Sequence, residues 1–225
     1  MSLLQLHEIS KIFGGLIAIN ELSFSVEQGS VVGLIGPNGA GKTTVFNCIT
    51  GNYKPEHGRI TFGGQDITGK RPHNIVEMGI ARTFQNIRLF NNLSVEDNVK
   101  IGLHNQERYS AITGVLRLPW YWSREKAAHE RALELLSLFG MADLADHQAG
   151  SLPYGAQRRL EIVRALATNP SLLLLDEPAA GMNPSETAEL MENIVKIRDT
   201  FQIAVMLIEH DMNLVMNICE GICVL

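Results

Sequence analysis

A glycine-rich run that ends in a lysine and two threonines lies at residues 36–44. Its members are Gly36, Pro37, Asn38, Gly39, Ala40, Gly41, Lys42, Thr43 and Thr44. This order fits the pattern G-x-x-x-x-G-K-[ST], the Walker A or P-loop pattern. Glycines let such a loop wrap tightly, so that successive backbone N–H groups converge on phosphate oxygens. Lys42 would supply a positive charge to the β- and γ-phosphates of a nucleotide, and Thr43 a hydroxyl to Mg²⁺.

The chain on either side of this loop favours a phosphate site. Residues 31–35 form an apolar run that is typical of a buried strand, and residues 44–49 look like the start of a helix. A strand, a glycine loop and a helix are the context that the pattern requires, because the helix N-terminus favours anions. The alternative is a glycine-rich turn with a chance lysine, which would not require that context.

A second apolar run ends in two carboxylates. Residues 172–175 are four leucines, which predict a buried strand, and Asp176 and Glu177 follow at its carboxyl end. Sheets of the α/β class bind ligands at this end of their strands. We expect Asp176 to hold Mg²⁺, directly or through water, and Glu177 to act as a general base toward an attacking water. The alternative, an acidic turn in solvent, does not explain why a phosphate loop is also present.

Composition limits the classes of protein that remain. The chain has 225 residues, 45% of them hydrophobic, which is enough for one sizeable core or for a core with a smaller lobe. The formal net charge of −5 gives no support for nonspecific binding to nucleic acid, so we expect no nucleic-acid partner. No apolar run approaches the length of a membrane span.

The pattern along the chain predicts an α/β fold with a helical insertion. Residues 3–9 and 22–26 alternate with period 2, and residues 59–67 resemble a hairpin with a glycine turn. Alanine, leucine and glutamate then recur at helical spacing over residues 124–139. Strands and helices alternate after about residue 158, which predicts a mainly parallel sheet.

At this point the chain resembles the nucleotide-binding subunit of an ABC transporter, because six elements occur in that family's order. Phe13 stands before a glycine pair, and the P-loop follows. Gln85 lies in a Thr-Phe-Gln-Asn segment that resembles the Q-loop. Residues 152–157 lie where the family signature belongs, and the acidic pair and His210 complete the set.

The resemblance implies a role for each of these residues. Phe13 would stack on adenine, and the P-loop residues would hold the phosphates. Glu177 is the implied general base, His210 the contact to the γ-phosphate, and Gln85 the sensor of metal and water. The implied ligands of Mg²⁺ are Thr43, Gln85 and Asp176. Tyr154 and Gly155, in the signature segment, would face the ATP that the opposing subunit binds.

The signature departs from the family pattern Leu-Ser-Gly-Gly-Gln. Serine, the first glycine and glutamine are replaced by Pro153, Tyr154 and Ala156, while Gly155 is retained. The family's serine donates a hydrogen bond to the γ-phosphate of the opposing subunit's ATP, which proline cannot do. Asn183 also stands where the family commonly has aspartate. A neutral contact between subunits would result there.

These departures resemble the branched-chain amino acid uptake branch of the family. The similarity rests on residues 81–90, 152–155 and 180–184. That branch has two different ATPase subunits, and the extra segment at about residues 105–124 resembles the longer of them. The resemblance therefore implies an ATP-hydrolysing subunit of an importer for branched-chain or related amino acids.

The resemblance also implies an architecture. We expect one ABC nucleotide-binding domain over residues 1–225, with a P-loop NTPase (RecA-like) core of α/β class at 1–90 and 158–225. An antiparallel β portion opens this core, and a helical lobe with the signature segment occupies 91–157. The run at 222–225 looks like a strand that has only begun, so we also expect a C-terminal tail to follow.

The implied cofactors are ATP and Mg²⁺, and the implied partners are proteins. They are transmembrane permease subunits, a second ATPase subunit in a homo- or heterodimer and, indirectly, a periplasmic or extracellular solute-binding protein. The expected location is the cytoplasmic side of the inner (plasma) membrane, as a peripheral subunit.

Three alternatives remain open from the sequence. The first is an ABC ATPase that serves lipid export, and the second is a soluble ABC-type protein that acts on ribosomes or DNA. The third is a P-loop kinase that transfers phosphate to a small metabolite. The adjacent Asp176 and Glu177, together with His210, favour water over a metabolite as the phosphate acceptor.

Overall fold

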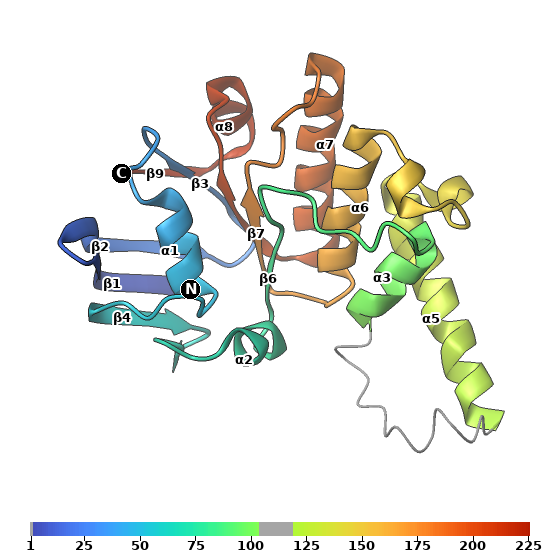
Figure 1. The fold of residues 1–225 in the computed structure, drawn as a ribbon, viewed down its shortest axis with the longest axis horizontal. Coiled ribbons are helices and arrows are strands. Elements are labelled where there is room, and N and C mark those ends of the chain that lie inside the picture. The colour runs from blue at the N-terminus through green and yellow to red at the C-terminus, as the bar shows by residue number, and fades with distance from the viewer. Residues whose placement is uncertain (1, 104–118) are drawn as a thin grey trace. The chain divides into compact units, whose positions relative to one another are not determined.

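The computed structural model describes residues 2–103 and 119–225, in two compact units (Figure 1). Unit 1 runs to Gln85 and resumes at Pro170, and unit 2 comprises Asn86–Asn169. These boundaries differ from the expected 90 and 158, because the helix that begins at Tyr154 packs with the other helices of unit 2. The prediction of a single nucleotide-binding domain stays a prediction. Most of the segment 105–124 lies outside the described residues.

An antiparallel sheet opens unit 1, with the strand order β2-β1-β4-β5. Its strands are β1 (Ser2–Phe13), β2 (Leu16–Glu27), β4 (His57–Phe62) and β5 (Gln65–Asp66). Leu4 pairs with Val26 on one side and with Phe62 on the other. Leu4 and Leu6 are buried while Gln5 between them is exposed, so the period-2 pattern gives the sheet one core face. The expected antiparallel portion is confirmed.

A parallel sheet of strand order β6-β7-β8-β3-β9 forms the rest of the unit 1 framework. Its strands are β3 (Val31–Ile35), β6 (Ile80–Arg82), β7 (Leu172–Asp176), β8 (Ala204–Ile208) and β9 (Gly221–Val224). Every residue of β7 and β8 is buried, as continuous apolar strands of a parallel sheet require. Ile208 pairs with Asp176 on one side and Leu34 on the other, so β7, β8 and β3 end at the same edge.

The described residues of unit 1 form four helices. They are α1 (Lys42–Ile49), α2 (Pro72–Glu77), α7 (Pro184–Phe201) and α8 (Met212–Ile218). Phe46 and Ile49 of α1 are fully buried in a core cluster that also contains Leu4 of β1 and Leu174 of β7. Helix α1 therefore lies between the two sheets, as Figure 1 shows.

Helix α7 begins with a capping box. The side chain of Asn183 accepts a hydrogen bond from the Glu186 backbone, and the Glu186 carboxylate accepts one from the Asn183 backbone. This reciprocal arrangement satisfies two backbone donors that a helix start otherwise leaves unpaired. The residue that departs from the family's usual aspartate thus has a local structural role here.

Unit 2 is helical where it is described. Its α-helices are α3 (Val95–Leu103), α5 (Pro119–Leu138) and α6 (Tyr154–Leu166), and the short 3₁₀ helices η1 (Ala142–Leu144) and η2 (Ala149–Ser151) connect α5 to α6. Asn98 is fully buried and donates to the carbonyl oxygens of Phe90 and Ser94. No helix among the described residues is long and apolar enough to cross a membrane.

Close packing of α3 on α6 leads to a prediction about Gly102. A Cβ on this residue would lie 2.5 Å from the Arg164 carbonyl oxygen and 2.8 Å from the Ala167 Cβ. Because the nearest atom is backbone, it cannot move aside cheaply. We expect Gly102→Ala to lower the free energy of unfolding by about 1–3 kcal/mol, measured by urea denaturation. Ile101→Ala, at a partly exposed position of the same helix, should cost less. Equal losses would contradict the close packing.

Candidate functional site

The glycine-rich loop connects β3 to α1 and depends on backbone conformations that favour glycine. Gly39 and Gly41 have φ values of +84° and +97°. A Cβ at Gly41 would lie 2.3 Å from the carbonyl oxygen of Ala18 in β2. Glycine is therefore required where the loop passes β2 and becomes the N-cap of α1. The loop then leads directly into a helix N-terminus, where anions are favoured.

Lys42, the first residue of α1, folds back over its own loop. Its ammonium group donates to the carbonyl oxygens of Gly36 at 2.7 Å and Pro37 at 2.9 Å. The residue is only 6% exposed, although it carries a charge. Both acceptors are neutral, so these contacts satisfy the donors without neutralising the charge. The loop thus holds a positive charge that suits an anionic ligand.

A cleft of about 370 Å³ lies beside this loop within unit 1. Most of its wall consists of residues that the sequence predicted for the site. These are Phe13, Asn38, Gly39, Gly41, Lys42, Thr43, Thr44, Gln85 and Glu177. Gly36, Pro37 and Ala40 belong to the same loop but are not part of the wall. Tyr154 and Gly155 belong to unit 2, where Tyr154 is about half exposed at the start of α6.

The cleft also has an apolar wall that sequence reasoning missed. Leu16, Ile17 and Ala18, at the start of β2, complete the lining. Leu16 is 70% exposed and Ile17 58% exposed, which is unusual for two large apolar residues side by side. Their position directly after the glycine pair that follows Phe13 could have indicated that they line the same cleft as Phe13.

Phe13 lies at the edge of the cleft with an exposed ring. Its centroid is 5.2 Å from that of Tyr53, edge to face, and 5.0 Å from the ammonium group of Lys11. Lys11 is in turn held by an ion pair with Glu56 at 2.7 Å. The ring is therefore fixed at its edge by neighbours while 40% of the residue remains open to solvent. This geometry is compatible with the predicted stacking on adenine.

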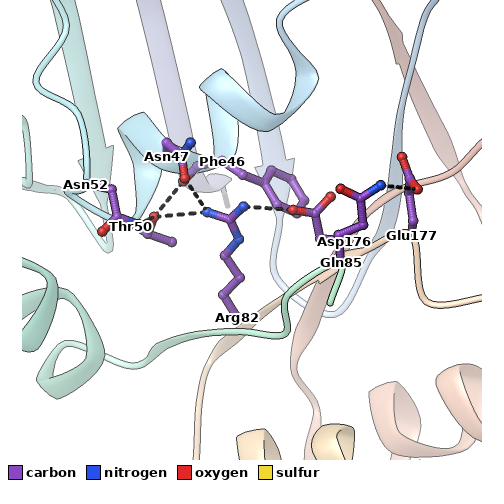
Figure 2. Close-up of polar contacts among 8 residues, drawn as sticks. All are labelled: Phe46, Asn47, Thr50, Asn52, Arg82, Gln85, Asp176 and Glu177. Carbon is purple, nitrogen blue, oxygen red and sulfur yellow. Dashed lines mark hydrogen bonds and ion pairs between the residues drawn. The ribbon is translucent and has the colours of Figure 1, made fainter. Parts of the chain in front are cut away.

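Glu177 stands between the two other predicted catalytic side chains. The Gln85 amide donates to Glu177 Oε2 at 2.9 Å (Figure 2), and His210 Nε2 lies 3.1 Å from Glu177 Oε1. The backbone of Glu177 has φ of +48°, a left-handed conformation that is rare for residues other than glycine. Such conformations concentrate at functional sites. The structure therefore brings Gln85, Glu177 and His210 together.

Asp176 lies at the end of β7 and is 2% exposed. Its Oδ2 accepts a hydrogen bond from Arg82 at 2.7 Å (Figure 2). The other two predicted ligands of Mg²⁺, Thr43 and Gln85, are in the cleft wall, and Asp176 adjoins Glu177, which is also there. A carboxylate, a hydroxyl and an amide oxygen form the hard-oxygen donor set that Mg²⁺ prefers alongside phosphate oxygens. The residues present therefore fit this ion.

Glu209 is a second carboxylate near the site, and sequence reasoning did not select it. It is 4% exposed, and it accepts hydrogen bonds from the backbone N–H groups of Ala179 at 2.8 Å and His210 at 3.1 Å. Burial raises the pKa of this carboxyl group above its usual value, against the opposing effect of the backbone donors. Glu209 thus connects the segment after Glu177 to the backbone of His210.

Comparisons with known proteins agree with this arrangement. A family model described as ABC transporter matches residues 19–180. The chain is 44% identical over 223 residues to the high-affinity branched-chain amino acid transport ATP-binding protein BraF of Pseudomonas aeruginosa, covering 99% of this chain and 88% of BraF. It is 45% identical over 222 residues to the corresponding protein LivG of Escherichia coli, covering 99% of this chain and 87% of LivG.

Solved structures give the same result for the fold. A nucleotide-free ATP-binding cassette from an ABC transporter is 34% identical, with a TM-score of 0.85, and the match covers 100% of this chain and 88% of that one. The ADP conformation of such a cassette has a TM-score of 0.86 at the same identity, over 100% of this chain and 87% of that one. The chain belongs to the ABC transporter family. The family resemblance and the α/β fold class that the sequence predicted are confirmed.

The raised pKa of Glu209 leads to a prediction about pH. A carboxyl whose pKa is higher in the folded than in the unfolded protein binds more protons when folded. Stability therefore falls as pH rises from the ordinary value of 4.5 through the folded pKa. Glu209→Gln cannot titrate, so its free energy of unfolding relative to wild type should increase over that range. Urea denaturation from pH 4.5 to 7.5 measures the difference. If the difference in free energy of unfolding between the variant and wild type is constant or decreases with pH, the pKa of Glu209 is not raised in the folded protein.

Proposed function

We propose that this chain is the ATP-binding and hydrolysing subunit of an ABC importer for branched-chain or related amino acids. The names of BraF and LivG, at 44% and 45% identity over nearly the whole chain, support the substrate class. The observation that carries the hydrolytic function is the position of Glu177. Its carboxylate contacts both Gln85 and His210 and lines the same cleft as the P-loop lysine.

The proposed roles follow from the cleft. The triphosphate of ATP lies along the P-loop, where the backbone N–H groups and Lys42 bind it, and the adenine stacks on Phe13. Glu177 accepts a proton from the attacking water, while Gln85 and His210 hold the carboxylate in place. Thr43, Gln85 and Asp176 would hold Mg²⁺, which when bound neutralises charge on the phosphate oxygens.

The proposed assembly contains two ATPase subunits and the permease subunits. Tyr154 and Gly155, at the start of α6, face the ATP that the opposing subunit binds. That opposing subunit is either a second copy of this chain or a different ATPase subunit. ATP promotes closure of this dimer because it binds the closed state better than the open one, and closure moves the attached permeases. The chain is then a peripheral subunit on the cytoplasmic side of the membrane, and a solute-binding protein acts through the permeases.

Two substitutions in the cleft distinguish binding from hydrolysis. Glu177→Gln keeps the shape of the side chain but removes the base, so ATP hydrolysis should fall about 100-fold or more, with nucleotide affinity retained. ATP should then trap a closed dimer. Lys42→Ala removes the cation that faces the phosphates and should weaken ATP binding itself by at least about tenfold. Phosphate release and equilibrium binding of a fluorescent ATP analogue measure the two effects.

Each variant serves as the control for the other, because one should lose hydrolysis with ATP binding retained and the other should lose ATP binding. Wild-type turnover by Glu177→Gln would exclude Glu177 as the base, and loss of ATP binding in that variant would show that the cleft is wrongly identified. Phosphate release without any added acceptor separates hydrolysis from a kinase activity. Co-purification of amino acid permeases, rather than a lipid exporter or ribosomes, tests the transport assignment.

The signature segment gives a further prediction. Pro153 is the N-cap of α6, with φ of −55°, a value that serine also adopts, and Gln157 anchors the preceding turn through the Leu152 carbonyl at 2.8 Å. Serine is a preferred N-cap residue and can also donate to a phosphate. Pro153→Ser should therefore leave turnover at or above the wild-type rate and tighten the ATP-bound dimer, measured by size-exclusion chromatography. A folded but inactive variant would show that proline shapes this segment.

A further inference from the structure

Arg82, the last residue of β6, connects three elements around the candidate site. Its Nη2 donates to Asp176 Oδ2 at 2.7 Å, and its Nη1 donates to Asn47 Oδ1 at 2.7 Å and to Thr50 Oγ1 at 3.4 Å (Figure 2). Asn47 belongs to α1, and Thr50 directly follows it. One guanidinium group therefore joins the end of β7 to the helix that begins with Lys42 and Thr43.

The guanidinium group is held in one position. Its central carbon lies 5.4 Å from the ring centroid of Phe46 and 5.3 Å from that of Phe84. Thr50, one of its acceptors, donates to the Phe46 carbonyl at 2.8 Å and accepts from Asn52 at 3.1 Å. Planar guanidinium groups suit such a combination of stacking and forked hydrogen bonding. Arg82 is thus part of a fixed network and not a side chain that swings toward Asp176 from solvent.

The pair between Arg82 and Asp176 is buried. The Arg82 side chain is 6% exposed and that of Asp176 is 3% exposed. A buried ion pair contributes little net stability compared with apolar residues, because both charges lose their hydration. Removal of one partner is different, since it leaves the other charge buried and uncompensated. The main consequence of Arg82 is therefore for the carboxylate that it contacts.

Two of the expected ligands of Mg²⁺ belong to the two elements that Arg82 joins, α1 and β7. Thr43 is in the first turn of α1, and Asp176 ends β7. Through Asn47 and Asp176, Arg82 fixes both elements at once. Loss of a partner that orients a metal ligand in this way typically lowers metal affinity by about 10- to 100-fold.

We propose that Arg82 is a positioning residue of the nucleotide site, which orients Asp176 relative to α1 and thereby sets the affinity for Mg²⁺ in the complex with ATP. This inference rests on the proposed function, because it assumes that ATP and Mg²⁺ occupy the cleft. Arg82 is not among the residues that line the cleft. Loss of Arg82 should therefore affect the binding of Mg²⁺ by Asp176 and leave the binding of the nucleotide by the P-loop largely unchanged.

The test measures binding of a fluorescent ATP analogue to the full chain, first in EDTA and then over a range of Mg²⁺ concentrations. Arg82→Gln should raise the Mg²⁺ concentration for half-maximal enhancement of binding by about tenfold or more. Affinity in EDTA should change less than about threefold, because the P-loop contacts remain. Arg82→Lys keeps the charge but loses the fork, so its shift should be smaller.

A double-mutant cycle tests whether Arg82 acts through Asp176. Asp176→Asn should raise the Mg²⁺ midpoint by itself, and adding Arg82→Gln should raise it no further. Asn47→Ala removes a neutral anchor of the guanidinium and should raise the midpoint by about threefold. This variant also tests the proposal if Arg82→Gln does not fold.

The matched control is a second buried pair of an arginine and a carboxylate, Arg158 with Glu161, in unit 2. Arg158→Gln should lower the thermal midpoint but leave the Mg²⁺ midpoint unchanged. An unchanged or lower Mg²⁺ midpoint in folded Arg82→Gln, or additive shifts in the cycle, would overturn the proposal. A lower midpoint would mean that Arg82 competes with the ion. Absence of any Mg²⁺ enhancement in the wild type would overturn the proposed function together with this inference.

Discussion

Parallel pairing of β7, β8 and β3 in one register determines where the reactive groups of unit 1 lie. Ile208 pairs with Asp176 and with Leu34, so the three strands end side by side. The chain leaves these ends as the P-loop, the Glu177 turn and the Glu209–His210 turn. Both faces of β7 and β8 are buried, so a shift by one residue would exchange the side chains of the two faces and disrupt the close packing on each. The packing of apolar side chains thus fixes the register, and the register fixes the site.

Buried charges then refine this framework. Glu209 accepts from the backbone N–H of Ala179, after Glu177, and from that of His210, after β8, while Arg82 connects the end of β7 to α1. Both side chains come from strand ends and not from the cleft wall. Buried polar groups of this kind are costly unless their partners are in place, so they also disfavour alternative arrangements of the loops that they connect.

The sequence was sufficient to predict those site residues that belong to a local sequence pattern and lie at the end of a strand or helix. The P-loop glycines, the acidic pair after the leucine run and the strand at 172–176 were predicted because periodicity and spacing carry that information. Arg82 and Glu209 were not selected, since their importance depends on partners far away in the sequence. The exposed pair Leu16 and Ile17 was missed for a related reason, because strand patterns do not show which apolar face lacks a cover.

The boundary of the helical insertion also depends on contacts between residues that are far apart in the sequence. The amphipathic pattern correctly indicated a helix near residue 158, but it did not show with which elements that helix packs. Gly102 packs against the backbone of α6, and this contact associates α6 with unit 2. A helical period reports that one face is buried and not what buries it.

The position of Lys42 has a consequence for the energetics of ligand entry. Its ammonium group rests on two carbonyl oxygens of its own loop and is almost completely shielded from water. An arriving phosphate therefore need not break an ion pair or strip a full hydration shell from this cation. Much of the desolvation and ordering was completed when the chain folded, so the loop is preorganised, and less of the binding free energy is lost in rearrangement. In this sense the folding of the loop prepares the cation for an anion before any ligand arrives.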